Sequence, residues 1–525
     1  MLTTTNKDNF VFEYEDLIIN ILGGLNDGNL DSLVVTVKVH KKGFYRNYRH
    51  SVNLYNGYQV EKLSTKISEH LEISSTVLRN AFIELTEQLE NYRFENQNQD
   101  DIEQAYVLND KDSDEATEFL RSPNLMDQTN NLIGRSGIVG EIINRLLMYL
   151  IFTSRKTDNP LHCISFGSSG VGKTHLQNKV ANLIPIEDRV EMTQLSANAF
   201  YYFKQYELAN KVVLIEDMDG AEDGLLPLRE LQTKKRISKS VVQKGIGGRG
   251  RTYNQVVEGP VCVAGCTTKE SIYEDNSNRS FLLYIDESPE QDERIMGYQR
   301  MHYAGKVDVD DQLNSARLLK NVQRLLKPIK VVNPFAEYLE LPRTVFKPRR
   351  TNIHYLQLIE VITFYHQMQR ETKYDQTTGE VYIETDLEDI RWANKLIKDV
   401  LLRKLDRLNR VTRDYFEKLT RYLKDKGTSI YNNREVRREL RINEATLRRY
   451  HKSLVSEGYI QRRNDIKGDS HHYEILEVNE FKDLEATIEK TLQLCIDLVT
   501  SSEGRQSEND EVKPLKNNTS SLIRY

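Results

Sequence analysis

The octapeptide Gly167-Ser168-Ser169-Gly170-Val171-Gly172-Lys173-Thr174 has the spacing G-x-x-x-x-G-K-T, which is that of a phosphate-binding P-loop. The apolar run Cys163–Phe166 comes directly before it, as a buried strand would, and a helix-compatible run begins at His175. Glycines let backbone N–H groups approach phosphate closely, and a helix N-terminus adds partial positive charge and free donors. The stretch therefore predicts a strand, a loop and a helix that together bind the phosphates of a nucleotide.

The residue types of this loop indicate ATP and Mg²⁺ as cofactors. The Lys173 ammonium is expected to bridge the β- and γ-phosphates, and the Thr174 hydroxyl is expected to bind Mg²⁺. The predicted nucleotide-binding residues are Gly167, Ser168, Ser169, Gly170, Val171, Gly172, Lys173, Thr174 and His175.

Composition indicates a soluble globular chain of several domains. The 525 residues are 38% hydrophobic and 29% charged, which argues against a disordered or fibrous protein. No run of ~18 apolar residues is present, so we expect no membrane span. The N-terminal stretch 1–6 lacks a hydrophobic signal core, and four cysteines in a chain of this length favour a reducing compartment. We therefore expect a cytoplasmic protein.

Apolar strand runs alternate with helical runs over 160–330, which predicts the α/β class: a parallel sheet with helices on both faces. Further helices are expected at about 58–71, 74–93, 114–122, 137–154 and 478–499. The predicted parts are an N-terminal α+β module at 10–95, an acidic linker and lead-in at 96–130, the P-loop core at 131–330, a helical lid at 331–405, a winged helix at 406–476, and a C-terminal helix with a disordered tail at 477–525.

A second motif of the core is the apolar run at 212–215, which ends in acids. One carboxylate at the end of such a strand holds Mg²⁺, and a neighbouring one can polarise the attacking water. The usual order is Asp then Glu, but this chain has Glu216 then Asp217, which leaves both assignments open. Glu216 and Asp217 are predicted catalytic residues and, with Thr174, the predicted metal ligands.

Two further strands carry candidate catalytic residues. The run 259–266 ends in Thr267 and Thr268, whose hydroxyls are expected to orient the attacking water. Arg279 precedes another apolar run, at the place where ring-forming ATPases carry an arginine finger that stabilises charge on a neighbour's γ-phosphate. The alternative is a surface arginine paired with Glu274 or Asp275.

Between these motifs lies a basic stretch, 231–257, that contains no Asp or Glu. Its two β-rich halves flank Gly245-Ile246-Gly247-Gly248, which predicts a β-hairpin with a basic, flexible tip. Such a tip suits contact with a phosphate backbone without reading bases, although it can also be a solvated surface hairpin. The predicted DNA-binding residues here are Lys239, Lys244, Arg249 and Arg251.

The order of P-loop, Glu-Asp, basic hairpin, Thr-Thr and Asn-Arg-Ser-Phe resembles the AAA+ ATPases, and more narrowly the minichromosome-maintenance-type replicative helicases. Arg279-Ser280-Phe281 resembles that family's finger strand, and Arg350 in Arg349-Arg350-Thr351 resembles its sensor-2 arginine. The acidic start at 384–389 resembles its last lid helix. The resemblance covers roughly 130–405 and implies an AAA+ core, a channel-facing hairpin and a homo-oligomeric ring, most simply a hexamer.

The chain is also similar to the helicase-like portion of primase-type proteins on bacterial mobile elements. Those proteins usually carry a zinc ribbon and a primase domain upstream, for which this sequence has neither room before residue 10 nor cysteine ligands. Primer synthesis is therefore not implied, and a primase or another replication protein becomes a candidate partner.

The region 401–470 holds 19 Lys and Arg against 10 Asp and Glu. Two short helices at 433–440 and 444–457 separated by a turn, followed by a strand pair, predict a winged helix that contacts duplex DNA or, alternatively, protein. The predicted DNA-binding residues are Arg448, Arg449 and Lys452 on the second helix and Arg462, Arg463 and Lys467 on the wing.

Two functions fit these motifs. The first is an ATP-dependent DNA helicase or translocase of a mobile genetic element, with single-stranded DNA in the ring channel and duplex DNA at the winged helix. The second is a DNA-binding AAA+ ATPase that loads or regulates replication or transposition proteins, or acts as a phage-defence switch, without unwinding.

Overall fold

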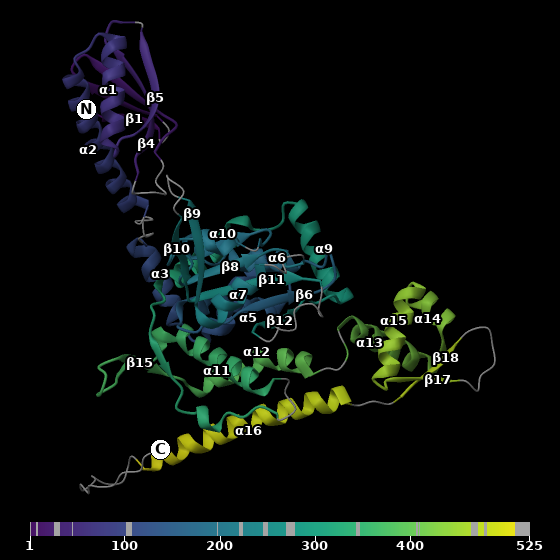
Figure 1. Cartoon of the computed structure of the whole chain (residues 1–525). Helices are drawn as coiled ribbons and strands as arrows, with labels where there is room; N and C mark the ends of the chain where they lie inside the picture. The colour runs from purple at the N-terminus through teal and green to yellow at the C-terminus, as the bar shows by residue number, and fades with distance from the viewer. Residues whose placement is uncertain are drawn as a thin grey trace. The chain divides into compact units, whose positions relative to one another are not determined.

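The computed structural model describes residues 2–6, 9–25, 32–44, 46–100, 108–196, 198–219, 224–244, 250–268, 279–342, 347–405, 408, 410–463, 471–476 and 480–509. The chain divides into two compact units, Met1–Val107 and Leu108–Tyr525 (Figure 1), and each is described by itself. Within the described residues, no helix has both the length and the apolar character needed to cross a membrane.

The N-terminal unit is an antiparallel sheet packed against two helices, which confirms the predicted α+β module. Its strands pair in chain order: β1 Leu2–Asn6, β2 Asn9–Tyr14, β3 Leu17–Leu22, β4 Val34–Lys41 and β5 Asn47–Asn53. The helices are α1 Gly57–Leu71 and α2 Ser75–Asp100. Alternate residues of β3 are buried because only one face of the sheet is covered. The strands begin at Leu2, before the expected residue 10, and α2 extends into the expected linker.

The second unit is built on a five-stranded parallel sheet, which confirms the α/β prediction. Its strands are β6 Cys163–Phe166, β7 Arg189–Met192, β8 Lys211–Ile215, β11 Val261–Thr267 and β12 Phe281–Tyr284. They lie in the order β12-β6-β11-β8-β7, so β6, the strand before the P-loop, lies between β12 and β11. All carboxyl ends therefore meet at one edge, where open α/β sheets bind ligands.

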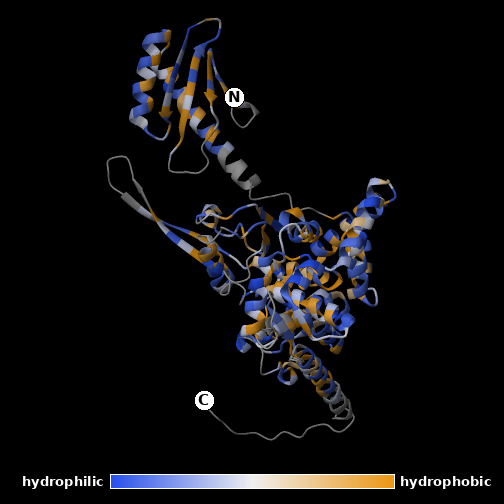
Figure 2. Ribbon diagram, turned by 90° about the vertical axis from the view of Figure 1, so that its right-hand side faces the viewer, coloured by the Kyte–Doolittle hydropathy of each residue, from blue (hydrophilic) through white to orange (hydrophobic). Residues whose placement is uncertain are grey.

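Two hydrophobic cores cover the two faces of this sheet. Val212 and Leu214 of β8 belong to one core, with α5 (Ile142–Thr153) and α10 (Val309–Leu325). Val213 and Ile215 belong to the other, with α7 (Leu225–Lys234). This strict alternation explains why β8 is apolar at every position except its first, since both faces are buried. Figure 2 shows the hydrophobic residues concentrated in the interior of this unit.

Helices around the sheet differ in part from the prediction. They are α3 Asp110–Leu120, α4 Leu125–Arg135, α5 Ile142–Thr153, α6 Lys173–Ala181 and α7 Leu225–Lys234, with the 3-10 turns η1 Ser154–Lys156, η2 Ile186–Asp188 and η3 Ala199–Tyr202. The expected helix at 137–154 begins only at Ile142, because Gly137 and Gly140 adopt positive φ. The helix α4 was not expected from the sequence.

The predicted hairpin is present as β9 Arg236–Lys244 and β10 Gly250–Glu258. The two strands pair along their full length, from Arg236 with Glu258 to Lys244 with Gly250. They form a two-stranded sheet separate from the parallel one. Residues 245–249, the predicted tip, lie outside the described residues.

After β12 the chain is mainly helical, with α9 Pro289–Tyr303, α10 Val309–Leu325, α11 Pro348–Tyr365 and α12 Leu387–Leu405. A small sheet joins β13 Lys330–Val332, β14 Lys373–Tyr374 and β15 Val381–Glu384, and the 3-10 turns are η5 Ala336–Tyr338 and η6 Gln367–Gln369. Ser288 and Asp308 cap α9 and α10, and Pro289 and Pro348 occupy first-turn positions.

The last helix, α16 Glu480–Asn509, returns to α12. Lys398 of α12 pairs with Glu485, and the Asn394 amide donates to the backbone carbonyl of Leu492. The helix therefore extends ten residues beyond the expected end at 499, and its apolar side belongs to the core of the ATPase unit. The predicted tail from 510 onward lies outside the described residues.

The region predicted as a winged helix contains α13 Arg410–Lys426, β16 Ile430–Asn432, α14 Asn433–Glu439, α15 Glu444–Ser456, β17 Ile460–Arg463 and β18 His472–Ile475. The strand β16, unexpected from the sequence, pairs with β18 and places the wing beside the helices. Asn432 and Asn443 cap α14 and α15. The domain has its own core, which includes Tyr415, Tyr431 and Leu447.

Candidate nucleotide site and nucleic-acid surfaces

The P-loop lies at the carboxyl edge of the sheet, between β6 and the first turn of α6. Gly170 and Gly172 have φ of 85° and 96°, which side-chain-bearing residues rarely adopt. Because Gly172 is the residue before α6, the unpaired N–H groups of the first helical turn face the loop. Partial burial and the charge of Lys179 lower the pKa of His175. The geometry is that of a helix N-terminal anion site.

The Lys173 side chain is buried and folds back along the loop. Its Nζ donates to the carbonyl oxygens of Gly167 and Ser168 at 2.9 and 2.7 Å. The loop thus holds the ammonium beside the place where phosphates are expected.

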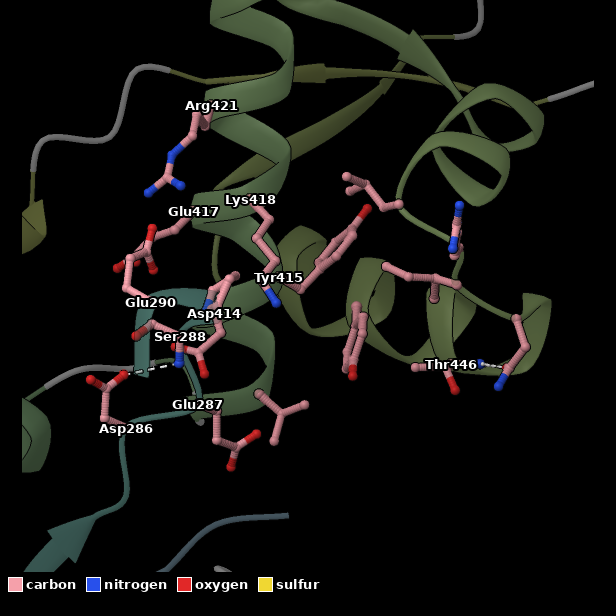
Figure 3. Close-up of a pocket in the computed structure, with 17 residues that line it drawn as sticks. Asp286, Glu287, Ser288, Glu290, Asp414, Tyr415, Glu417, Lys418, Arg421 and Thr446 are labelled. Atoms are coloured by element: carbon pink, nitrogen blue, oxygen red, sulfur yellow. Dashed lines mark hydrogen bonds between the residues drawn. The ribbon is translucent and has the colours of Figure 1, made fainter. Parts of the chain in front are cut away.

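Glu287, which sequence reasoning missed, fixes the start of the loop. Its carboxylate accepts from the Ser168 backbone N–H at 2.9 Å and from the Ser168 hydroxyl at 3.0 Å. Figure 3 shows Glu287 with Asp286 and Ser288 in the segment after β12, and the dashed line from Ser288 N–H to Asp286. The pocket drawn there is lined by none of the residues predicted from the sequence.

The predicted acids lie beside the P-loop helix. Glu216 Oε1 accepts from the amide of Asn178 on α6 at 3.2 Å, and Asp217 Oδ1 accepts from the backbone N–H of Asp219 at 2.8 Å. The pKa of Cys266 is raised to about 12, mainly by burial; the side-chain hydrogen bond with Thr174 partly opposes this shift, and the charges of Asp217 and Glu216 add to it. P-loop, acids and β11 therefore meet at one place.

These oxygen donors fit Mg²⁺. A hydroxyl from Thr174 and carboxylates from Glu216 and Asp217 are hard ligands of the kind that Mg²⁺ prefers, and no Cys or His competes in the predicted set. When bound, the ion would neutralise charge on the β- and γ-phosphates. Among the described residues no separate cluster of His, Cys, Asp and Glu suits a metal ion.

Asp219 is the second residue that sequence reasoning missed. It accepts hydrogen bonds from the Thr267 hydroxyl, from the Thr268 backbone N–H at 3.1 Å and from the Thr268 hydroxyl at 2.6 Å. The carboxylate thus orients both predicted water-positioning threonines. The sequence shows Asp219 as a third acid after Glu216 and Asp217. It does not show its partners, because they lie 48 and 49 residues away in the chain.

A glycine in β11 allows the acidic segment 216–219 to lie close to that strand. After Glu216 the chain passes next to β11, where the Met218 N–H donates to the Cys266 carbonyl at 2.9 Å. A Cβ on Gly265 would lie 2.2 Å from the Met218 sulfur, so any side chain there would push the acidic loop away.

Arg279 and Arg350 lie together, in a cavity at the opposite edge of the sheet. Arg279 directly precedes β12, and Arg350 is in the first turn of α11. Both line one cavity with Lys235, His162 and other residues, and Arg279 Nε donates to the Thr233 hydroxyl at 3.1 Å. Glu274 and Asp275, the alternative partners of Arg279, lie outside the described residues.

His162 is an uncharged residue of this cavity's lining. Burial, with a smaller contribution from the charge of Arg279, lowers the pKa of His162 to about 4, so the ring is neutral at physiological pH. Its Nδ1 accepts from the Val263 backbone N–H at 3.3 Å. The positive charge in the cavity therefore comes from Arg279, Arg350 and Lys235.

The hairpin residues are only partly described. Lys239 donates to the Asn198 side chain at 2.7 Å and lies over the Tyr201 ring at 5.4 Å, so it anchors the hairpin to η3. The backbone of Lys244 and Arg251 is placed in β9 and β10, but their side chains, like all of Arg249, lie outside the description. A DNA contact of these three remains a prediction.

The winged-helix cations lie on one helix and one wing strand. Arg448, Arg449 and Lys452 are exposed on α15, and Arg448 also pairs with Glu444 at 2.6 Å. On β17, Arg463 pairs with Glu474 at 2.8 Å, whereas exposed Arg462 contacts His471. Lys467 lies outside the described residues. DNA contact by these cations is likewise a prediction.

One comparison with known proteins, the match to a family model, supports the fold. The model of the MTBMA_p00010 P-loop domain matches residues 110–328. Solved structures that match include a "putative ATPase" from Cytophaga hutchinsonii (15% identity, TM-score 0.29, covering 56% of this chain and 98% of that one). A full-length MCM homolog from Methanopyrus kandleri also matches (10% identity, TM-score 0.39, covering 77% and 76%). No curated protein matches. With the strand order and the P-loop, the domain match supports a P-loop ATPase with an AAA+ core.

Proposed function

We propose that the chain is an ATP-dependent DNA translocase or helicase that acts as a homo-oligomeric ring, most simply a hexamer, with ATP and Mg²⁺ bound between subunits. One observation carries this proposal: Arg279 and Arg350 share a cavity that cannot serve the P-loop of the same subunit. If the nucleotide site is completed by a neighbouring copy, each subunit must present cations that lie far from its own P-loop, as these two arginines do.

The separation follows from the strand register. Phe281 of β12 lies opposite Cys163 of β6, and the two strands are parallel. Arg279 is two residues before Phe281, and Gly167 is four residues after Cys163. At ~3.3 Å per residue, the two lie roughly 20 Å apart along the strands. An arginine side chain cannot span that distance.

DNA as the substrate is supported by the basic surfaces. The paired strands β9 and β10 form a two-stranded ribbon separate from the parallel sheet and extend from the body of this unit (Figure 2), with the acid-free stretch along them. Such a projection suits a channel contact with single-stranded backbone. The exposed cations of α15 suit duplex DNA. The resemblance to mobile-element proteins supports a role in the replication of such an element, with a primase as a candidate partner.

The decisive experiment measures strand displacement on a forked duplex by the purified full chain with ATP and Mg²⁺. We expect displacement and DNA-stimulated hydrolysis, and loss of both in Lys173→Ala, because that side chain holds the phosphates. Lys179→Ala, on the same helix beyond the loop, is the matched control. Hydrolysis stimulated by DNA without displacement or movement along a strand would favour the loader or regulator instead.

An exposed tyrosine beside the hairpin strands allows a test of single-strand binding that does not depend on charge. Tyr202, at the end of η3, is 81% exposed, and η3 packs against both β9 and β10. A base stacked on an aromatic ring contributes ~1–3 kcal/mol, largely independent of salt. We expect Tyr202→Ala to weaken single-strand binding by about tenfold with an unchanged salt slope. Tyr303→Ala on α9, where the ring is 92% exposed, is the control. Equal effects of both changes would contradict a stacking role.

A further inference from the structure

The cavity that holds Arg279 and Arg350 contains a third cation, Lys235. Among the described residues that line it, none is Asp or Glu. His162 contributes no charge, as its lowered pKa shows. Outside this lining, burial and the charge of Asp158 raise the pKa of Glu360, and the charge of Lys235 partly opposes that shift. Three cations, with no acid among the described lining residues, fit a polyanion such as a triphosphate.

Lys235 also begins the hairpin. It follows α7 with φ of 56°, and its backbone N–H donates to the Leu231 carbonyl. Its carbonyl accepts from the Gly259 N–H at 2.7 Å, which closes the base of the hairpin just beyond the pair of Arg236 with Glu258. Two residues earlier, Thr233 accepts the hydrogen bond from Arg279. One short segment thus touches both the cavity and the two hairpin strands.

We propose that Lys235 contacts the triphosphate bound by the neighbouring subunit and that it links occupancy of that site to the base of the hairpin. This inference rests on the proposed ring. A phosphate drawn between Lys235, Arg279 and Arg350 pulls on the residue whose backbone closes the hairpin. The hairpin strands then respond to the neighbour's nucleotide rather than to that of their own subunit.

The test compares Lys235→Ala with Lys234→Ala. Lys234 is the matched control because it carries the same charge one residue earlier, pairs with Glu230 at 2.6 Å and is 70% exposed outside the cavity. We expect DNA-stimulated hydrolysis to fall ~10²-fold in Lys235→Ala, as on removal of one donor to transition-state charge, and to stay near wild type in Lys234→Ala. Lys235→Arg keeps the charge and should recover most of the activity. Wild-type activity in Lys235→Ala, or no recovery in Lys235→Arg, overturns the proposal.

Mixed rings show whether Lys235 acts on a neighbour. Lys173→Ala subunits have no functional P-loop but an intact cavity, so co-expression with Lys235→Ala should give more activity than either variant alone. Arg279→Ala is mixed in parallel. If Arg279→Ala recovers and Lys235→Ala does not, the inference about Lys235 fails while the ring stands. If neither recovers, the proposed ring itself fails.

The link to the hairpin has its own readout. Single-strand affinity is measured with and without a non-hydrolysable ATP analogue. In the wild type and in Lys234→Ala the analogue should change the affinity, whereas Lys235→Ala should show about the same affinity in both states. A nucleotide effect of wild-type size in Lys235→Ala would remove the link.

Discussion

Arg279→Ala is expected to lower ATP hydrolysis by about 10³-fold or more while ATP binding stays unchanged. The reason is the position of Arg279 at the amino end of β12, far from the P-loop of its own subunit and beside Arg350. The guanidinium would therefore act on charge that develops on a neighbour's γ-phosphate, and would not contribute to holding ATP in its own subunit. Steady-state hydrolysis and equilibrium binding of a fluorescent ATP analogue measure the two effects separately.

Arg300→Ala serves as the control for this change. Arg300 lies on α9, is 64% exposed and pairs with Glu293, so its loss removes a surface charge only. Hydrolysis by Arg279→Ala at the rate of this control would show that Arg279 is not the finger. Loss of ATP binding together with hydrolysis would place the arginine in the site of its own subunit.

The second large effect is a difference in ATP hydrolysis and ATP binding between variants of Glu216 and of Asp217. The order of these two acids in the sequence left both roles open. The Asn178 amide holds Glu216 against the P-loop helix, whereas Asp217 is exposed and contacts the Asp219 N–H. We therefore expect Glu216 to be the metal-side acid and Asp217 to polarise the attacking water. Asp217→Asn should reduce hydrolysis by about 10²–10⁴-fold with normal ATP affinity.

Glu216→Gln should instead weaken ATP binding only when Mg²⁺ is present, because it removes a ligand of the ion. To compare the two variants, the nucleotide affinity of each is measured in Mg²⁺ and again in EDTA. The opposite pattern, with Mg²⁺-dependent binding lost in Asp217→Asn and kept in Glu216→Gln, would exchange the two roles. Asp219→Asn is a useful third variant, since it should disturb Thr267 and Thr268 without touching the ion.

Much of the fold could be predicted because its signals are local. The P-loop, the apolar strand runs and the hairpin depend on residue types within a few positions of one another, and the structure has each where it was expected. The helix-turn-helix was predicted for the same reason, from two short helical runs, the turn between them and the apolar spacing. Errors fell where glycines break a helical pattern, as at Gly137 and Gly140, and where short strands such as β16 form only by pairing with a distant one.

The sequence by itself determined that the chain has a P-loop, acids after a buried strand and a basic hairpin, because those patterns are set by backbone conformation and side-chain type along short segments. Only the tertiary structure decided that Asp219 orients Thr267 and Thr268, that Glu287 fixes Ser168, and that Lys235 shares a cavity with Arg279 and Arg350. These residues lie tens to more than a hundred positions apart, and the order of the strands in the sheet brings them together. Strand order depends on packing of the whole core, which no local pattern contains.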